Sequence, residues 1–318
     1  MRLVVNPLAG PVEREAARAY DFHRALPGYA PTPLVDARAA AEALGVARVW
    51  VKDESSRLGL PSFKILGASW AIHRALEVRG DRPRLACATD GNHGRAVARV
   101  ARERGLEATV FVPADMIAAR REAIAAEGAS VEVVDGSYDE AVERAAEAGA
   151  LVIQDTGADE VPRWTVEGYG TIGAEIDVEP DVVAVQVGVG SFAAAMVRRF
   201  AGARIVGVEP LTAACALASI EAGEPVEVPG PHESVMAGLN CGRVSPGAWP
   251  FLSRGIEAFA AVSDDRAREA VRLLARDGVT AGESGAAGLA GLLAFRDELS
   301  LSPGDTVLVM NTEGDTTI

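Results

Sequence analysis

Residues 85–112 read LACATDGNHGRAVARVARERGLEATVFV, and this stretch decides the fold class. It opens with a short apolar run, Leu85–Ala88, that is typical of a buried strand. A polar loop with two glycines follows, and Gly94–Arg104 then has the composition of a helix. A second apolar run, Thr109–Val112, predicts another strand. A strand, a helix and a strand in this order are typical of a parallel β-α-β unit.

The same alternation continues on both sides of this stretch. Further strand signals lie at 49–52, 131–134, 151–153, 182–187, 205–208 and 306–310, and helix signals at 66–78, 117–127 and 138–148. We therefore predict an α/β fold of two interleaved domains, with parallel-rich twisted sheets flanked by helices. No linker rich in Gly or Ser separates the domains, so they must share a cleft. The proline-rich stretch 223–249 is a long loop of the kind that often carries function.

Composition limits the kinds of partner. Of the 318 residues, 49% are hydrophobic, which is enough for a sizeable core. Lys and Arg number 31 against 45 Asp and Glu, and the net charge of −14 argues against binding nucleic acid or an anionic membrane surface. Three scattered cysteines without a CxxC pair suit a reducing cytoplasm. The N-terminus lacks a signal-peptide pattern, and the apolar run 182–197 is too interrupted for a membrane span.

Lys64 stands where a helix is expected to begin, in the run PSFKILGA over residues 61–68. The positive end of the helix dipole disfavours a cation at this place. It therefore favours a neutral amine, which is the form that a nucleophilic or Schiff-base lysine needs. The alternative is an ordinary surface lysine.

Three polar loops follow predicted strands, at the strand ends where ligands of α/β sheets bind. The loop 88–95 contains Asp90 and Asn92 and opens a helix whose free N–H groups suit an anion, although Asp90 is also a plausible helix cap. The loop 188–191 (GVGS) suits a phosphate but matches neither GxGxxG nor the P-loop. The run 310–316 (MNTEGDT) lies after an apolar strand and is either a cleft lining or a frayed tail.

One activated lysine, one phosphate loop and several polar strand ends, without a metal cluster or a Ser-His-Asp order, suit pyridoxal phosphate. On these motifs the chain resembles the fold-type II pyridoxal-phosphate enzymes, the tryptophan synthase β family. Within that family it is most similar to the diaminopropionate ammonia-lyases. The motifs that carry the resemblance are SFK (62–64), TDGNHGR (89–95), QDT (154–156), EGYGT (167–171), MAGL (236–239), GESG (282–285) and NTEGDT (311–316).

The resemblance implies a domain organisation and a role for each candidate residue. It implies a homodimer whose large cofactor-binding domain is formed by residues 1–66 and 163–318, with a small mobile domain of residues 67–162 inserted in it. The cofactor-binding residues would be Lys64 as the Schiff-base lysine, Asn92 at the ring hydroxyl, Gly188, Val189, Gly190 and Ser191 at the phosphate, and Thr312 at the pyridine nitrogen.

Asp90 and Asp155 carry the prediction of the reaction. A substrate with two amino groups has an extra positive charge that a nearby carboxylate stabilises, and a carboxylate in the cleft can take the α-proton. The resemblance implies these roles for both residues. We predict α,β-elimination of the small amino acid 2,3-diaminopropionate to pyruvate and ammonia, with Lys64, Asp90 and Asp155 as catalytic residues. The alternative is that Asp90 caps a helix and Asp155 ends a strand.

Other functions stay open. The same fold and cofactor serve serine or threonine dehydration and β-replacement, and a non-catalytic cofactor-binding homologue is a remote alternative. A nucleotide-dependent oxidoreductase is disfavoured because GxGxxG is missing. His23, His73 and His232 receive no functional interpretation, and His93 is a weaker candidate than its neighbour Asn92.

Overall fold

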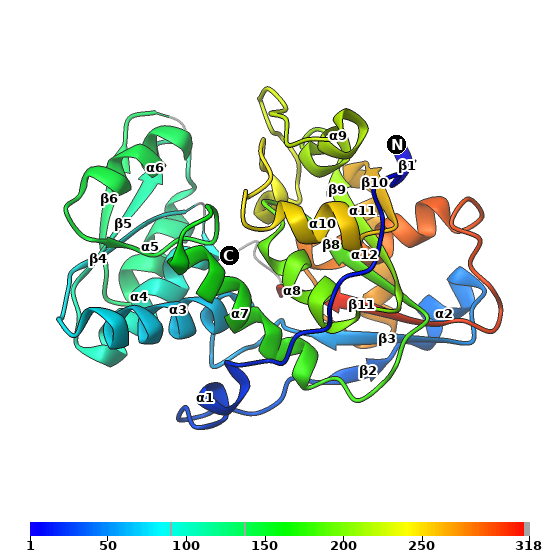
Figure 1. Ribbon diagram of the computed structural model, residues 1–318, viewed down its shortest axis with the longest axis horizontal. Helices are drawn as coiled ribbons and strands as arrows, with labels where there is room; N and C mark the ends of the chain where they lie inside the picture. Colours follow the sequence, from blue (N-terminus) through cyan, green and yellow to red (C-terminus); the bar gives the residue numbers. More distant parts are fainter. Residues whose placement is uncertain (90, 137, 315–318) are drawn as a thin grey trace.

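The computed structural model describes residues 1–89, 91–136 and 138–314. It contains two sheets flanked by helices, with the smaller sheet on the left of Figure 1 and the larger one on the right. The larger sheet has the strand order β1-β10-β9-β8-β11-β3-β2, and the smaller has the order β6-β5-β4-β7. The predicted α/β fold with parallel-rich sheets is therefore confirmed.

Parallel strands form the centre of the larger sheet. Its strands are β1 (Arg2–Val5), β2 (Leu34–Asp36), β3 (Arg48–Asp53), β8 (Val182–Gln186), β9 (Arg204–Pro210), β10 (Ala258–Val262) and β11 (Thr306–Asn311). The edge strands β1 and β2 pair antiparallel with their neighbours, whereas all inner pairings are parallel. The sequence analysis missed β1, β2 and β10. The first two are short and only partly buried, so they have no long apolar run. β10 is a buried apolar run, but three of its five residues are alanine, which has little strand propensity.

The smaller sheet is parallel throughout. Its strands are β4 (Leu85–Ala88), β5 (Ala108–Pro113), β6 (Ser130–Val134) and β7 (Leu151–Val152). These strands agree with the predicted ones to within one residue at each end. The β-α-β unit expected from residues 85–112 is present, with α4 (Asn92–Arg104) as its helix.

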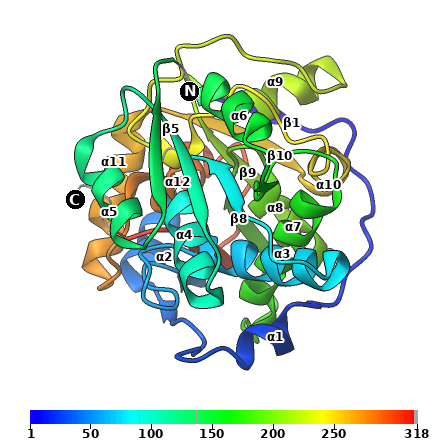
Figure 2. The ribbon, with the colours of Figure 1, turned by 90° about the vertical axis from the view of Figure 1, so that its left-hand side faces the viewer.

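Helices cover both faces of both sheets. One face of the larger sheet packs against α7 (Glu160–Ala174), α8 (Ser191–Arg199), α9 (Cys215–Ala222) and α10 (Trp249–Gly255), and the other against α2 (Arg38–Leu44), α11 (Asp264–Arg276) and α12 (Glu283–Phe295). The smaller sheet lies between α3 (Lys64–Arg79), α4 and α5 (Ala118–Ala126) on one face and α6 (Tyr138–Glu147) on the other (Figure 2). Among the helices described, none is long and apolar enough to cross a membrane.

A close contact between α3 and α7 joins the parts of the molecule that carry the two sheets. A Cβ on Gly67 would lie only 2.5 Å from Cε1 of Tyr169, so glycine is needed where the two helices meet. The short helix α1 (Tyr20–Arg24) supports the same contact, because buried His23 binds the Leu66 carbonyl of α3 and the Thr171 hydroxyl of α7. The start of α3 is therefore held from two sides.

Candidate active site

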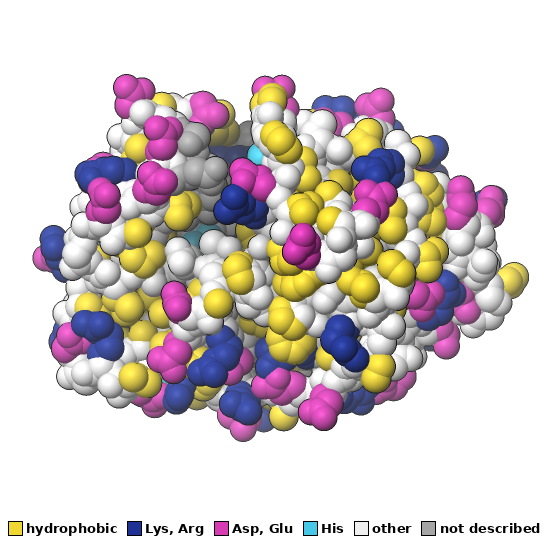
Figure 3. Space-filling model, turned by 45° about the horizontal axis from the view of Figure 1, so that its top comes forward, with side chains coloured by type: hydrophobic (Ala, Val, Ile, Leu, Met, Phe, Trp, Pro, Cys, Tyr) yellow, Lys and Arg dark blue, Asp and Glu magenta, His cyan; other side chains and the backbone are white. Residues whose placement is uncertain are grey.

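A cavity of about 870 Å³ lies between the two sheets, and Figure 3 shows the hollow from above. The carboxyl ends of β3, β4, β5, β8 and β11 supply much of its lining, together with the loop after α9. Residues 223–248 form the long loop that the prolines predicted, and within it only the short 3-10 helix η1 (Ala237–Leu239) is regular. Predicted site residues that line the cavity are Lys64, Asn92, Asp155, Gly188, Val189, Gly190 and Thr312.

Lys64 and Asp155 form an ion pair inside the cavity. Lys64 begins α3, as the sequence predicted, and its Nζ lies 2.5 Å from Oδ2 of Asp155, which follows β7. The Lys64 charge, assisted by His93, holds the pKa of Asp155 at about 2 although burial alone would raise it.

The glycine-rich loop leads into α8. Gly190 is the N-cap of this helix and has a φ of +95°, in the left-handed region that favours glycine. A Cβ there would also lie 2.6 Å from the Leu252 side chain. Ser191 does not line the cavity, although its neighbours Gly190 and Phe192 do. Its hydroxyl donates to the backbone carbonyl of Asp155 and is therefore not directed at the place where the resemblance implied a phosphate.

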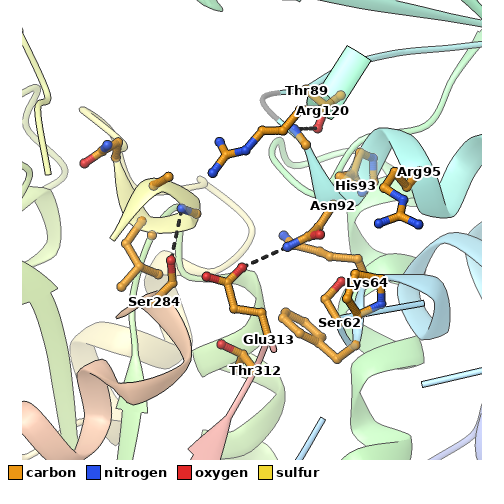
Figure 4. A pocket seen from close by; sticks show the side chains of 18 of the residues that line it. Ser62, Lys64, Thr89, Asn92, His93, Arg95, Arg120, Ser284, Thr312 and Glu313 are labelled. Atoms are coloured by element: carbon orange, nitrogen blue, oxygen red, sulfur yellow. Dashed lines mark hydrogen bonds between the residues drawn. The ribbon is translucent and has the colours of Figure 1, made fainter. Parts of the chain in front are cut away.

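Asn92 and Thr312 face the same cavity from opposite sheets, as Figure 4 shows. Asn92 Nδ2 donates to Glu313 Oε2 at 2.8 Å, a contact that the sequence analysis did not anticipate. Thr312 Oγ1 accepts a hydrogen bond from Gln186 Nε2 at 3.0 Å. Asp90, the other predicted carboxylate, lies outside the described residues.

Sequence reasoning missed several groups that line the cavity. Glu313 was quoted within a motif but given no role, and Arg120 on α5 extends into the cavity in Figure 4. His93 on α4, the weaker candidate beside Asn92, also lines the cavity. A simple signal was overlooked as well. The chain contains only two lysines, Lys52 and Lys64. Because Lys52 is fully buried elsewhere, counting lysines narrows the candidates for an amine nucleophile to one.

A cluster of four buried charges holds the loop that leads to Lys64, and we call it the β3 charge cluster. Its members are Lys52, Glu54, Arg57 and Glu175, whose side chains are at most 1% exposed. Lys52 Nζ lies 2.5 Å and Arg57 Nη1 lies 2.7 Å from Glu175 carboxylate oxygens, and Arg57 also bonds Glu54 at 2.6 Å. Two cations thus balance two anions, so the cluster carries no net charge.

Comparison with known proteins identifies the relatives of this arrangement. The model of the pyridoxal-phosphate dependent enzymes matches residues 25–313. The chain is 33% identical to diaminopropionate ammonia-lyase of Escherichia coli strain K12, with 96% of this chain and 90% of the relative covered. It is 30% identical to a biosynthetic L-threonine dehydratase of Mycobacterium leprae, with 92% of this chain and 70% of the relative covered.

Solved structures agree with these sequence matches. The Escherichia coli diaminopropionate ammonia-lyase in complex with an aminoacrylate-PLP azomethine reaction intermediate superposes with a TM-score of 0.91 at 31% identity, covering 99% of this chain and 94% of that chain. Maize serine racemase, at 21% identity and a TM-score of 0.84, shares the fold over 97% of this chain and 95% of its own.

Proposed function

The chain belongs to the family of pyridoxal-phosphate dependent enzymes, and from this premise we propose that it converts 2,3-diaminopropionate and water to pyruvate and ammonia. The diaminopropionate ammonia-lyases that it matches over nearly their whole length support this reaction. The structural observation that carries the proposal is the Lys64–Asp155 pair. It sets a partly buried carboxylate 2.5 Å from the only lysine that faces the cavity among the described residues.

The lining residues fit the cofactor. The aldehyde of pyridoxal phosphate needs an amine, and Lys64 supplies one. The N-terminus of α8, opened by Gly190, offers backbone N–H groups that suit the phosphate. Because Thr312 Oγ1 accepts its hydrogen bond from Gln186, its own hydrogen is left for another acceptor, which suits a pyridine nitrogen that is not protonated.

Asp155 is the residue we assign to proton transfer. The bound cofactor withdraws electrons from the substrate and so acidifies its α-hydrogen. The Asp155 carboxylate, ionised at neutral pH because its pKa is about 2 beside Lys64, is placed to accept that proton. Its negative charge also stabilises a substrate with a second ammonium group. We propose that Asp90 does the same from the loop before α4, so that the two carboxylates serve the two stereoisomers.

Threonine dehydration is the second candidate, because a threonine dehydratase is among the relatives at 30% identity. A hydroxyl leaving group carries no charge, so it gains nothing from an added carboxylate. The two Asp residues therefore favour the diamine.

The test measures 2-oxo acid release by the purified, cofactor-loaded protein. The substrates are D- and L-diaminopropionate beside D- and L-serine and threonine. We expect fast release from diaminopropionate and slow release from the hydroxy amino acids. The opposite preference would make the protein a dehydratase, and release from none of them would overturn the proposed elimination.

Variants separate the residue roles. We expect Asp155→Asn and Asp90→Asn each to abolish turnover of at least one stereoisomer while the cofactor stays bound. Asp265→Asn, at a side chain that is 93% exposed, is the control and should behave as the unaltered protein does. Borohydride reduction followed by peptide mapping should mark Lys64 and not Lys52. Unchanged turnover of both isomers in both cleft variants would remove the carboxylates from the mechanism.

We also propose that residues 67–162 form a small domain that closes over the substrate and excludes water. The smaller sheet, which lies entirely between residues 85 and 152, supports this division. Small-angle scattering with and without substrate should detect the closure as a smaller radius of gyration. We further propose that the enzyme acts as a homodimer in the cytoplasm, and sedimentation of the purified protein tests the dimer.

A further inference from the structure

Tyr169 is a buried phenol whose hydroxyl is not explained by packing. The side chain is 0% exposed, and its ring packs edge-on against Phe63 with the ring centroids 4.7 Å apart. The same ring fills the space that a side chain on Gly67 would need. A phenylalanine would make all these contacts. Within the described part of the chain the Tyr169 hydroxyl has no hydrogen-bond partner, and such a buried group costs free energy.

The hydroxyl faces the Lys64–Asp155 pair. Lys64 Nζ lies 5.8 Å from the centroid of the Tyr169 ring, and the charges of both Lys64 and Asp155 act on the pKa of the phenol. Burial and the Asp155 carboxylate raise this pKa above its usual range, so Tyr169 stays protonated and is a hydrogen-bond donor. Among the described residues no partner meets the geometry of a hydrogen bond to the Tyr169 hydroxyl, because Lys64 Nζ bonds the Asp155 carboxylate, yet both groups lie near enough to act on the phenol.

Lys64 cannot keep its bond to Asp155 once its amine binds the cofactor. An amine that condenses with an aldehyde loses hydrogens and turns toward the aldehyde carbon. Asp155 is then a partly buried carboxylate that has lost its cationic partner and can accept from another donor. We propose that Tyr169 is a positioning residue, which donates its hydroxyl hydrogen to the Asp155 carboxylate when Lys64 turns to the cofactor. This inference rests on the proposed function and deepens it, because the new bond keeps Asp155 ionised and able to accept a proton.

The other titratable groups around Asp155 are less suited to this task. His93 on α4 lowers the Asp155 pKa together with Lys64, but its Nε2 bonds the Ile153 carbonyl at 2.9 Å. Because a carbonyl only accepts, the hydrogen of the neutral ring lies on Nε2, and Nδ1 has none to donate. Cys87 on β4 is a weak donor, and burial raises the pKa of its thiol. Tyr169, from α7, therefore remains the strongest neutral donor among these described neighbours.

The test compares Tyr169→Phe with Tyr29→Phe. Tyr29 also donates its hydroxyl to a carboxylate, Glu175 at 2.5 Å, but in the β3 charge cluster. The readouts are the visible absorbance of the bound cofactor against pH, the pH dependence of kcat/KM, and the thermal unfolding midpoint. We expect Tyr169→Phe to move the acidic inflection of absorbance and rate upward by about one pH unit, since a carboxylate that loses a donor ionises less readily.

The two variants should differ in the opposite sense in their thermal unfolding midpoints. Tyr169→Phe should leave the unfolding midpoint unchanged or raise it, whereas Tyr29→Phe should lower it and leave the inflection in place. Asp155→Asn should remove the inflection, and adding Tyr169→Phe to it should change nothing more. The inference is overturned if Tyr169→Phe keeps the original inflection, or if its shift persists in the Asp155→Asn background. If diaminopropionate is not turned over but the absorbance inflection still moves, the proposed function fails while the role of Tyr169 is supported.

Discussion

Replacing Glu175 by Gln tests whether the β3 charge cluster holds the fold together. The substitution keeps the shape of the side chain and removes one of two anions that balance Lys52 and Arg57. Glu175 also accepts hydrogen bonds from the Tyr29 hydroxyl at 2.5 Å and the Thr32 backbone N–H at 3.1 Å. The variant therefore leaves a buried, uncompensated positive charge, and breaking such a pair costs about 3–5 kcal/mol.

Equilibrium urea unfolding of the cofactor-loaded protein, followed by tryptophan fluorescence, measures this loss. Glu221→Gln is the matched control, because Glu221 pairs with Arg2 at 2.6 Å while the two side chains are 42% and 51% exposed. An exposed pair contributes up to about 1 kcal/mol, so the control should change the free energy of unfolding by less than that. If Glu175→Gln unfolds within about 1 kcal/mol of the unaltered protein, the cluster does not stabilise the fold as argued.

Two further predictions concern the cofactor and acid. Gly190→Ala should weaken cofactor binding about tenfold, because a φ of +95° and the contact with Leu252 oppose a side chain. Absorbance titration measures the cofactor affinity. An equal loss of affinity in the control Gly202→Ala, where a Cβ meets nothing within 4 Å, would contradict this prediction. Stability should fall as the pH drops below about 4.5, because Arg57 and Lys52 hold the pKa of Glu175 at about 2 and burial lowers the pKa of His23 to about 3. In this range the unfolded chain binds more protons than the folded one; an unfolding midpoint that stays constant from pH 5 to 3 would refute this.

Local sequence signals could predict the parts of the site that follow strands or begin helices. Lys64 at the start of α3, the glycines before α8 and Thr312 after β11 were found in this way, because parallel strands bring their carboxyl ends to one edge. The position of these residues around one cavity bears out that reasoning. Their roles toward the cofactor stay predictions.

Contacts between distant residues could not be predicted from local patterns. The bond between Asn92 and Glu313 joins the two sheets, and nothing in either motif shows that the side chains meet. The β3 charge cluster depends on Glu175 at the end of α7 meeting the end of β3. Tyr169 was quoted in a motif, but the environment of its hydroxyl is set by the packing of α3 on α7, which residue spacing alone does not encode.

The pairing of the larger sheet also constrains the order in which the protein can be built. β1 pairs with β10, so Arg2 lies beside Ala261, and β3 pairs with β11, so Arg48 lies beside Thr306. During synthesis from the N-terminus, β3 can pair early only with β2, and β1 stays unpaired until β10 has been made. Thr312 and Glu313 follow β11, so the cavity is completed last. A growing chain therefore cannot gain stability from binding in the finished cavity. Contacts between residues this distant in sequence also predict slow folding, during which β1 is unpaired for much of the time.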